Sequence, residues 1–349
     1  IDAAEAWVGH FRGGLGLVCV LATTMFAAIS GSSVVTAMAM GTFLIPAMVA
    51  RGYHRPFALG TVGASGTLGI LIPPSLGMIL YGLIAEQSVP RLFLAGVIPG
   101  LIQAMILAGV VMILSRKHNY ASGTRVSGPE FLRRNLRALP ALFIPISVFV
   151  GIYSGYATVT ESAGVAAISS VLIAVLVYRE VGWRDIFGMT AEAMKAASAV
   201  TFIVMFALLF AHWITGSGVP TRLVRWATGV GLEPWQFLLA INLAMLILGM
   251  FLDAVAVLLI VTPIVLPLLP AMGIDPIHFG IVLIVNMEIA FLTPPIGLNL
   301  FVLSSIAKAP LSEAIRGVIP FVVAMVGFLI LVTYVPEVSL WLPNLVFNQ

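Results

Sequence analysis

Charged side chains are scarce in this chain of 349 residues, at 9% of the sequence against 60% hydrophobic residues. A soluble domain carries about 25% charged residues. The sequence therefore cannot cover a surface that faces water, and it indicates an integral membrane protein. Its apolar runs are long and rich in Leu, Ile, Val, Ala and Met, with many Gly and Pro, which favours transmembrane helices over the alternating strands of an outer-membrane barrel.

Residues and motifs for several kinds of reactive site are missing too. The single cysteine, Cys19, lies in an apolar run, which excludes a disulfide framework and a thiolate metal site. We expect Cys19 to be a small buried residue. The sequence also lacks a Gly-rich phosphate loop, a nucleophile elbow and a zinc motif. No sequence motif therefore predicts an enzyme.

What the chain does contain is an internal match between its two halves. With a shift of 221 positions, Pro73-Pro74 falls on Pro294-Pro295, and Gly96-Val97-Ile98-Pro99 falls on Gly317-Val318-Ile319-Pro320. Paired interruptions in the two halves of an apolar chain indicate a transporter binding site. We predict two structural repeats, and we expect them to be inverted because that symmetry places both polar tips near the middle of the membrane.

The predicted repeats cover residues 1–114 and 139–349. By the same shift the first repeat would start about 80 residues before Ile1, so we expect it to lack its N-terminal spans. Residues 115–138 connect the repeats and form the most basic stretch of the chain, which predicts a cytoplasmic linker.

Each repeat is predicted to contain a re-entrant helical hairpin and a discontinuous helix. The hairpins lie at about 15–49 and 235–269. Most of their helical arms have about 15 apolar residues, or roughly 22 Å of helix. Such arms are too short to span a hydrocarbon core of about 30 Å comfortably, which favours hairpins that enter and leave the membrane on the same side. The discontinuous helices lie at about 57–85 and 278–303, where Gly and Pro interrupt long apolar runs. Clean spans are predicted at 93–114, 139–157, 161–178, 198–214 and 317–335, with an amphipathic surface helix at 183–196.

The first hairpin tip is Ser30-Gly31-Ser32-Ser33, and the Gly-rich segment 63–69 is expected beside it. Unwound backbone at membrane depth is tolerated only inside protein or around a wet cavity. Freed carbonyls and hydroxyls suit a hard cation such as Na⁺, and the helix N-termini at the same breaks favour an anionic group. The alternative is that these small residues serve only helix packing.

Two acidic residues lie in apolar surroundings in the second half. Asp253 falls opposite Ser32 under the shift, and an ionisable residue in an apolar segment is a functional hypothesis by default. We expect Asp253 to cap the next helix and to organise a sodium site, with capping alone as the alternative. Glu288 precedes Thr293-Pro294-Pro295, and it either carries coupling or holds the break open.

With these residues the chain resembles the large membrane subunit, or M-type subunit, of tripartite ATP-independent periplasmic (TRAP) transporters. The resemblance covers essentially all 349 residues, and we expect the family's first spans to lie outside them. The stretches that carry it include Gly66-Thr67-Leu68-Gly69 before Ile72-Pro73-Pro74-Ser75, Gly249-Met250-Phe251-Leu252-Asp253, and Thr293-Pro294-Pro295 before Gly297-Leu298-Asn299.

The resemblance implies an all-α polytopic protein that works as an elevator-type sodium symporter, not an enzyme. It implies uptake of a small organic acid, such as a dicarboxylate, sialic acid or another sugar acid, across a bacterial or archaeal inner membrane. The implied partners are a small four-helix membrane subunit, a periplasmic substrate-binding protein and membrane lipids, with no nucleic acid. No cofactor is implied apart from Na⁺ as the coupling ion.

Carried over to this chain, the resemblance also implies the site residues. One sodium site would use Ser30, Gly31, Ser32 and Ser33 with Gly66 and Gly69, and a second would use the backbone around Asp253 with Thr293 and Gly297. The substrate would lie between the two tips, near Ser65, Thr67, Asn286 and Asn299.

Three alternatives remain open at the level of sequence. A stand-alone carrier or antiporter for Na⁺ and carboxylates would need no binding protein. An intramembrane enzyme would use Asp253 and Glu288 as an acid pair. A passive channel is the third, although hairpin tips that end inside the protein suit gated access better than an open pore.

Overall fold

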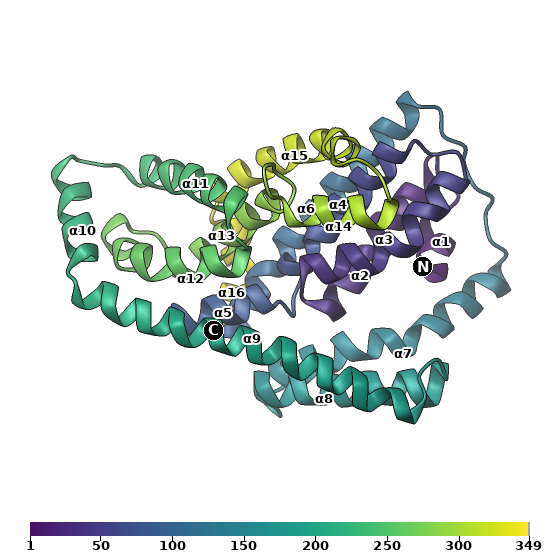
Figure 1. Ribbon diagram of the computed structural model, residues 1–349, viewed down its shortest axis with the longest axis horizontal. Helices are drawn as coiled ribbons and strands as arrows, with labels where there is room; N and C mark the ends of the chain where they lie inside the picture. Colours follow the sequence, from purple (N-terminus) through teal and green to yellow (C-terminus); the bar gives the residue numbers. More distant parts are fainter. Residues whose placement is uncertain (348–349) are drawn as a thin grey trace.

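The computed structural model describes residues 1–347, which are helical apart from turns, loops and one isolated bridge between Arg12 and Ser122. Within these residues, eight helical segments are long and apolar enough to cross a membrane. The all-α polytopic membrane fold is therefore confirmed. Figure 1 shows the hairpin helices α2 and α3 on one side, α11 and α12 on the other, and the long α9 running along one edge of both.

The helices are listed here in chain order. They are α1 (Asp2–Val8), α2 (Gly14–Ser30), α3 (Ser33–Ala50), α4 (Arg55–Leu71), α5 (Leu76–Ile84), α6 (Val89–Lys117), α7 (Gly128–Tyr153), α8 (Val159–Leu172), α9 (Trp183–Gly216), α10 (Val219–Gly229), α11 (Pro234–Phe251), α12 (Ala254–Val265), α13 (Pro276–Ala290), α14 (Leu298–Ala307), α15 (Leu311–Tyr334) and α16 (Glu337–Phe347). A π-helical turn, Ile173–Tyr178, extends α8, and two short 3₁₀ turns follow α12.

The first hairpin turns at two residues between α2 and α3. Gly31 ends α2 in the left-handed region with φ 62°, and Ser32 precedes α3 in an extended conformation. A Cβ atom on Gly31 would lie 2.9 Å from the carbonyl oxygen of Pro74. Glycine is required here because the backbone conformation and the close approach of Pro74 both exclude a side chain.

The first discontinuous helix consists of α4 and α5, separated by residues 72–75. Pro73 and Pro74 lack the backbone N–H that a continuous helix needs, so the chain leaves the helix there. Ser75 restarts it, because its hydroxyl accepts a hydrogen bond from the Met78 amide at 3.4 Å. The Leu76 amide donates to the Gly31 carbonyl at 3.2 Å, which connects this break to the first hairpin tip.

The second half has helix bounds in nearly the same register. Shifting α2 by 221 positions gives 235–251, against Pro234–Phe251 for α11. The second break lies between α13 and α14, and its Ile296 amide donates to the Met250 carbonyl at 3.1 Å, near the second tip. The organisation of the two halves as an inverted repeat, with re-entrant hairpins, stays a prediction.

Two stretches differ from what the sequence predicted. α7 begins at Gly128, so much of the basic stretch 115–138 is helical, and Glu130 stabilises its first turns through an ion pair with Arg134 at 3.0 Å. α9 is one continuous helix of 34 residues where a surface helix at 183–196 and a separate span were expected. That separation was wrong because the stretch has no proline and is rich in helix formers.

The core lies around α4 and α13, which are buried along most of their length. α4 also packs closely against α15 at Gly60 and Gly317. A Cβ atom on Gly60 would lie 2.0 Å from the Gly317 carbonyl oxygen, so no side chain fits between the two backbones. Small residues allow helix backbones to approach closely in membranes, where apolar side chains gain little from leaving lipid. The two glycines therefore fix the contact between these helices.

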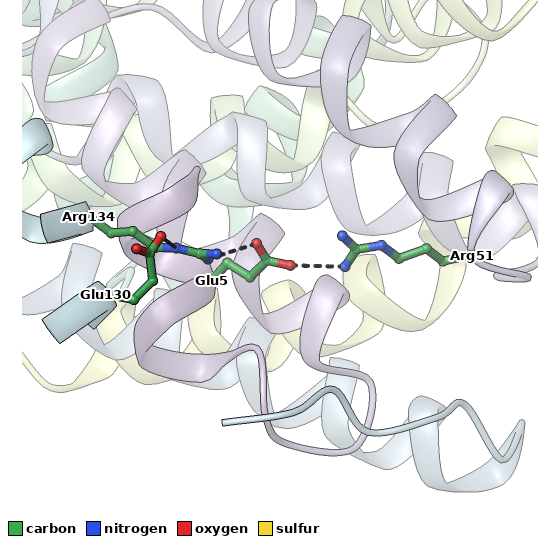
Figure 2. Close-up of polar contacts among 4 residues, drawn as sticks. All are labelled: Glu5, Arg51, Glu130 and Arg134. Carbon is green, nitrogen blue, oxygen red and sulfur yellow. Dashed lines mark hydrogen bonds and ion pairs between the residues drawn. The ribbon is translucent and has the colours of Figure 1, made fainter. Parts of the chain in front are cut away.

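An ion-pair network connects α1 to the end of the first hairpin and to α7 (Figure 2). Glu5 lies between two arginines, with Oε1 3.0 Å from Arg51 Nη1 and Oε2 3.2 Å from Arg134 Nη1. Trp7 on the same short helix donates from Nε1 to Asn135 Oδ1 at 2.8 Å. α1 therefore joins the C-terminal end of α3 to the N-terminal part of α7.

Candidate functional site

A cavity of about 200 Å³ lies between the two hairpin tips. The first tip contributes Gly31, Ser32 and Ser33, and the second contributes Asp253 with the start of α12. The start of α5 and one face of α13 complete the walls. The complete lining is Gly31, Ser32, Ser33, Val34, Ile70, Leu76, Gly77, Asp253, Ala254, Val255, Leu258, Ile284, Met287 and Phe291.

Helix ends of both polarities meet at this cavity. α3, α5 and α12 begin at it, and their first residues line it. Gly31 and Phe291, which also line it, are the C-terminal caps of α2 and α13. Helix N-termini carry partial positive charge and favour anions, whereas C-termini carry partial negative charge and favour cations. The cavity can therefore accept an anion and a cation side by side.

The structure brings together the residues predicted for the first sodium site. The Ser30 hydroxyl is hydrogen-bonded to Thr36 Oγ1 and donates to the Ser32 carbonyl at 3.3 Å. A Cβ atom on Gly69 would lie 2.5 Å from that Ser32 carbonyl oxygen, and one on Gly66 would lie 2.8 Å from Ala37 Cβ. The two glycines let α4 contact the tip, so the oxygen atoms of the tip gather against α4.

Around the second tip, the predicted residues lie on two neighbouring segments. Asp253 is exposed and caps α12, because its Oδ2 accepts a hydrogen bond from the Val255 amide at 3.1 Å. Thr293 and Gly297 lie in the second break, where Thr293 Oγ1 donates to the Ile289 carbonyl at 2.7 Å. Gly297 has φ 46°, and a Cβ atom there would lie 3.0 Å from the Thr293 carbonyl. Asp253 lines the cavity, and the two break residues do not.

The four predicted substrate residues are all buried, and none of them lines the cavity. Ser65 and Thr67 donate to carbonyls of their own helix, at 2.7 and 2.8 Å. Asn286 donates to Asn242 Oδ1 at 2.7 Å, within the helix packing. Asn299 comes nearest, because its Nδ2 donates at 2.8 Å to Ser33 Oγ, and Ser33 is a lining residue.

Sequence reasoning did not identify two groups of residues at or near this site. The apolar wall, Ile284, Met287 and Phe291, carries no distinctive signal because most of the chain is apolar. Gln103 and Asn242 are buried polar residues inside apolar helices, a signal that could have identified them. Among residues 1–347, no group of three or more His, Cys, Asp or Glu could hold a metal ion.

The sequence was compared with known proteins. The model of the tripartite ATP-independent periplasmic transporter, DctM component, matches residues 1–338. The C4-dicarboxylate TRAP transporter large permease protein DctM of Pseudomonas aeruginosa is 46% identical over 99% of this chain and 81% of its own length. The sialic acid TRAP transporter large permease protein SiaM of Vibrio cholerae is 34% identical over 98% of this chain and 80% of its own length.

A solved structure supports the all-α polytopic membrane fold. The crystal structure of the YdaH transporter of Alcanivorax borkumensis superposes with a TM-score of 0.65 over 98% of this chain and 85% of that chain. The two sequences are 14% identical, so this likeness concerns the fold alone. Family, fold and membrane spans agree, and the prediction of a transporter instead of an enzyme is confirmed. The chain belongs to the DctM component family of tripartite ATP-independent periplasmic transporters, as a multi-pass protein of the inner membrane.

Proposed function

We propose that this chain performs sodium-coupled uptake of a small organic acid through the cavity between its hairpin tips. The observation that carries this proposal is the meeting of the helix starts of α3, α5 and α12 at one cavity. Helix starts suit a carboxylate because the backbone N–H donors of the first turn and the helix dipole point the same way. Some of these amides, those of Leu76, Met78 and Val255, already donate within the protein, and the other amides of the first turns are the ones offered to the ligand. An anionic substrate would therefore bind there without a basic side chain.

Coupling to Na⁺ follows from the charge next to that carboxylate site. Asp253 also lines the cavity, so an organic anion would bind close to a second negative charge. A cation bound at the carbonyl ends of α2 and α13 would relieve this repulsion. Moving more Na⁺ charges than substrate charges also lets the membrane potential drive uptake, at about 2.3 kcal/mol per charge per 100 mV.

For the substrate we propose a small organic acid, with the C4-dicarboxylates tested first. Large permeases of Pseudomonas aeruginosa, Vibrio cholerae and Rhodobacter capsulatus that are named for C4-dicarboxylates are 46%, 40% and 39% identical to this chain. Relatives named for isethionate, sialic acid and ectoine are 36%, 34% and 31% identical.

We propose that the chain works by an elevator movement and with two partners. The mobile part would contain the two hairpins, α2–α3 and α11–α12, and the two discontinuous helices, α4–α5 and α13–α14, and the remaining helices would form the scaffold. A small four-helix membrane subunit would support the scaffold, and a periplasmic binding protein would deliver the substrate. One relative is a permease named DctMQ, of which this chain covers 54%, which fits a second membrane subunit fused to the first.

The test is uptake of radiolabelled succinate, fumarate, sialic acid and isethionate into proteoliposomes. They would contain the full-length protein with its small subunit, with and without the cognate binding protein and an inward Na⁺ gradient. Uptake that needs both the binding protein and Na⁺ supports the proposal. Na⁺-driven uptake without the binding protein favours a stand-alone carrier, and uptake that ignores the Na⁺ gradient rejects sodium coupling.

A further inference from the structure

Glu288 is a fully buried acid that the proposed transport cavity does not use. It lies on α13, has no exposed surface, and is not among the residues that line the cavity, although its neighbour Met287 is. Neither carboxyl oxygen has a hydrogen-bond partner within 3.5 Å among residues 1–347. A carboxylate in this position would be a charge removed from water without compensation, which proteins avoid.

Two polar side chains face the Glu288 carboxyl, Gln103 from α6 and Thr67 from α4. Gln103 is also fully buried, and neither atom of its amide has a partner among the residues described. Thr67 donates its hydroxyl proton to the Ala64 carbonyl at 2.8 Å. While it keeps that bond, it can offer Glu288 only lone pairs, as an acceptor.

The balance of donors and acceptors in this cluster determines which form of Glu288 fits. As a carboxylate, Glu288 adds acceptors only, and of the two groups that face it only the Gln103 amide has a donor not already used, since the Thr67 hydroxyl donates to the Ala64 carbonyl. As a carboxylic acid it can accept from Gln103 Nε2 through one oxygen. It can then donate from the other oxygen to Gln103 Oε1 or Thr67 Oγ1. Only the protonated form satisfies the Glu288 and Gln103 side chains together.

We propose that Glu288 is a neutral, protonated acid that positions α13 against α4 and α6, and that it is not a carrier of the coupling ion. α4 and α13 are the first halves of the two discontinuous helices, and both end near the cavity. The hydrogen bonds that the neutral acid can make to Gln103 and Thr67 would fix the distance between the two breaks while the chain moves. The prediction for uptake rests on the proposed function, whereas the prediction that Glu288 is protonated does not.

Other ionisable groups around α13 lie away from the cluster. Tyr81 of α5 donates to the Pro276 carbonyl at 2.5 Å, and His278 is hydrogen-bonded to Ser339, both at the opposite end of α13. Asp253 borders the cavity, and the charged residues of α4, α6 and α15 lie near the ends of those helices. No charged group among the described residues therefore stabilises an ionised Glu288.

The direct test is infrared difference spectroscopy of the full-length protein with its small subunit, wild type against Glu288→Gln. The expected result is a carbonyl stretch of a protonated carboxylic acid in the wild type that is missing from E288Q. This band should persist between about pH 6 and about pH 8, a range in which an exposed glutamate is ionised. A wild type without the band, or one that loses it within this range, overturns the proposal whether or not any substrate is transported.

Transport provides the second test, with Glu288→Gln compared with Glu288→Leu and with the swap Glu288→Gln/Gln103→Glu. E288Q and the swap should keep Na⁺-driven uptake within about threefold of wild type, because both retain a donor and an acceptor in the cluster. E288L should lower the maximal rate and the melting temperature. Normally folded E288Q that has lost uptake, or substrate-driven proton entry that E288Q abolishes, would make Glu288 a coupling residue and overturn the proposal.

Discussion

Asn299, near the start of α14, donates a hydrogen bond from Nδ2 to Ser33 Oγ of the first hairpin tip, at 2.8 Å. The two residues are 266 positions apart, and both are buried. This bond joins a cavity-lining residue of one half of the chain to the discontinuous helix of the other. It therefore couples the geometry of the first tip to the position of α14.

The first prediction concerns this hydrogen bond. Ser33→Ala should weaken Na⁺-driven uptake by roughly 5- to 100-fold, because an unpaired buried donor costs about 1–3 kcal/mol. In the Ser33→Ala background, Asn299→Leu should lower uptake by a smaller factor than it does in the wild type, since its hydrogen-bond partner is already missing. The measurement is a double-mutant cycle on the Na⁺ dependence of uptake. The control is Ser170→Ala, which removes a hydroxyl that bonds only within α8. Strictly additive effects would mean that the bond does not link the two sites.

The second prediction concerns the glycine that contacts the first tip. Gly69→Ala would place a Cβ atom 2.5 Å from the Ser32 carbonyl oxygen and 2.6 Å from Thr36 Oγ1. The tip would have to move, at about 1–3 kcal/mol for overpacking, so apparent Na⁺ affinity should fall roughly tenfold or more. Gly109→Ala on α6 is the matched control, because nothing lies within 4 Å of its added Cβ. Normal Na⁺ dependence in G69A would remove Gly69 from the predicted sodium site.

The third prediction separates the charge of Asp253 from its role as a helix cap. Asn caps helices about as well as Asp, so Asp253→Asn should retain the bond to the Val255 amide and the stability of the protein. Loss of the charge should raise the Na⁺ concentration for half-maximal uptake. Asp275→Asn is the control, because Asp275 caps α13 through the Ile277 amide at 2.7 Å and does not line the cavity. If Asp253→Asn and Asp275→Asn show the same Na⁺ dependence, Asp253 only caps α12 and takes no part in binding Na⁺.

The fourth prediction concerns the ion pairs in Figure 2. Glu5→Gln removes both of its contacts, those with Arg51 on the first hairpin and with Arg134 on α7. Such partly exposed pairs are worth about 0.2–1 kcal/mol each and weaken in salt. The uptake rate should therefore fall by roughly two- to thirtyfold at low ionic strength.

The control for the Glu5 variant lies on α7 alone. Glu130→Gln removes two ion pairs within α7, those with Arg133 and Arg134, and should leave the uptake rate nearly unchanged. The measurement is the initial rate of uptake by each variant at low and at high ionic strength. An effect of E5Q that is the same at both would mean that the ion pairs do not act between the hairpin and α7.

Several elements were predictable because their signals are local. Pro73-Pro74 and Pro294-Pro295 interrupt helices wherever they stand, and both breaks lie at these positions. The turn at Gly31 was equally clear, since few residues other than glycine adopt its φ of 62°. α9 was divided wrongly because charged positions at 183–196 suggested a surface helix, whereas the backbone simply continues.

The candidate site was only partly predictable, as Ser65 and Asn286 illustrate. Both are polar residues in apolar helices, and the sequence could not tell which face each helix turns to the cavity. Ser65 donates to its own helix, and Asn286 faces Asn242 of α11. A hydroxyl or amide in a membrane helix must find a partner in either case, so its presence alone does not distinguish packing from ligand binding.

By itself the sequence determined the membrane class, most of the helices, the two breaks and the two polar tips, because hydropathy, proline and glycine act on the chain locally. The tertiary structure alone decided which of those polar groups meet. It placed Ser33 against Asn299, Asp253 across the cavity from the first tip, and Glu288 away from that cavity. These contacts depend on how helices that are distant in the sequence rotate and pack, and a chain that is 60% hydrophobic carries little information about that rotation.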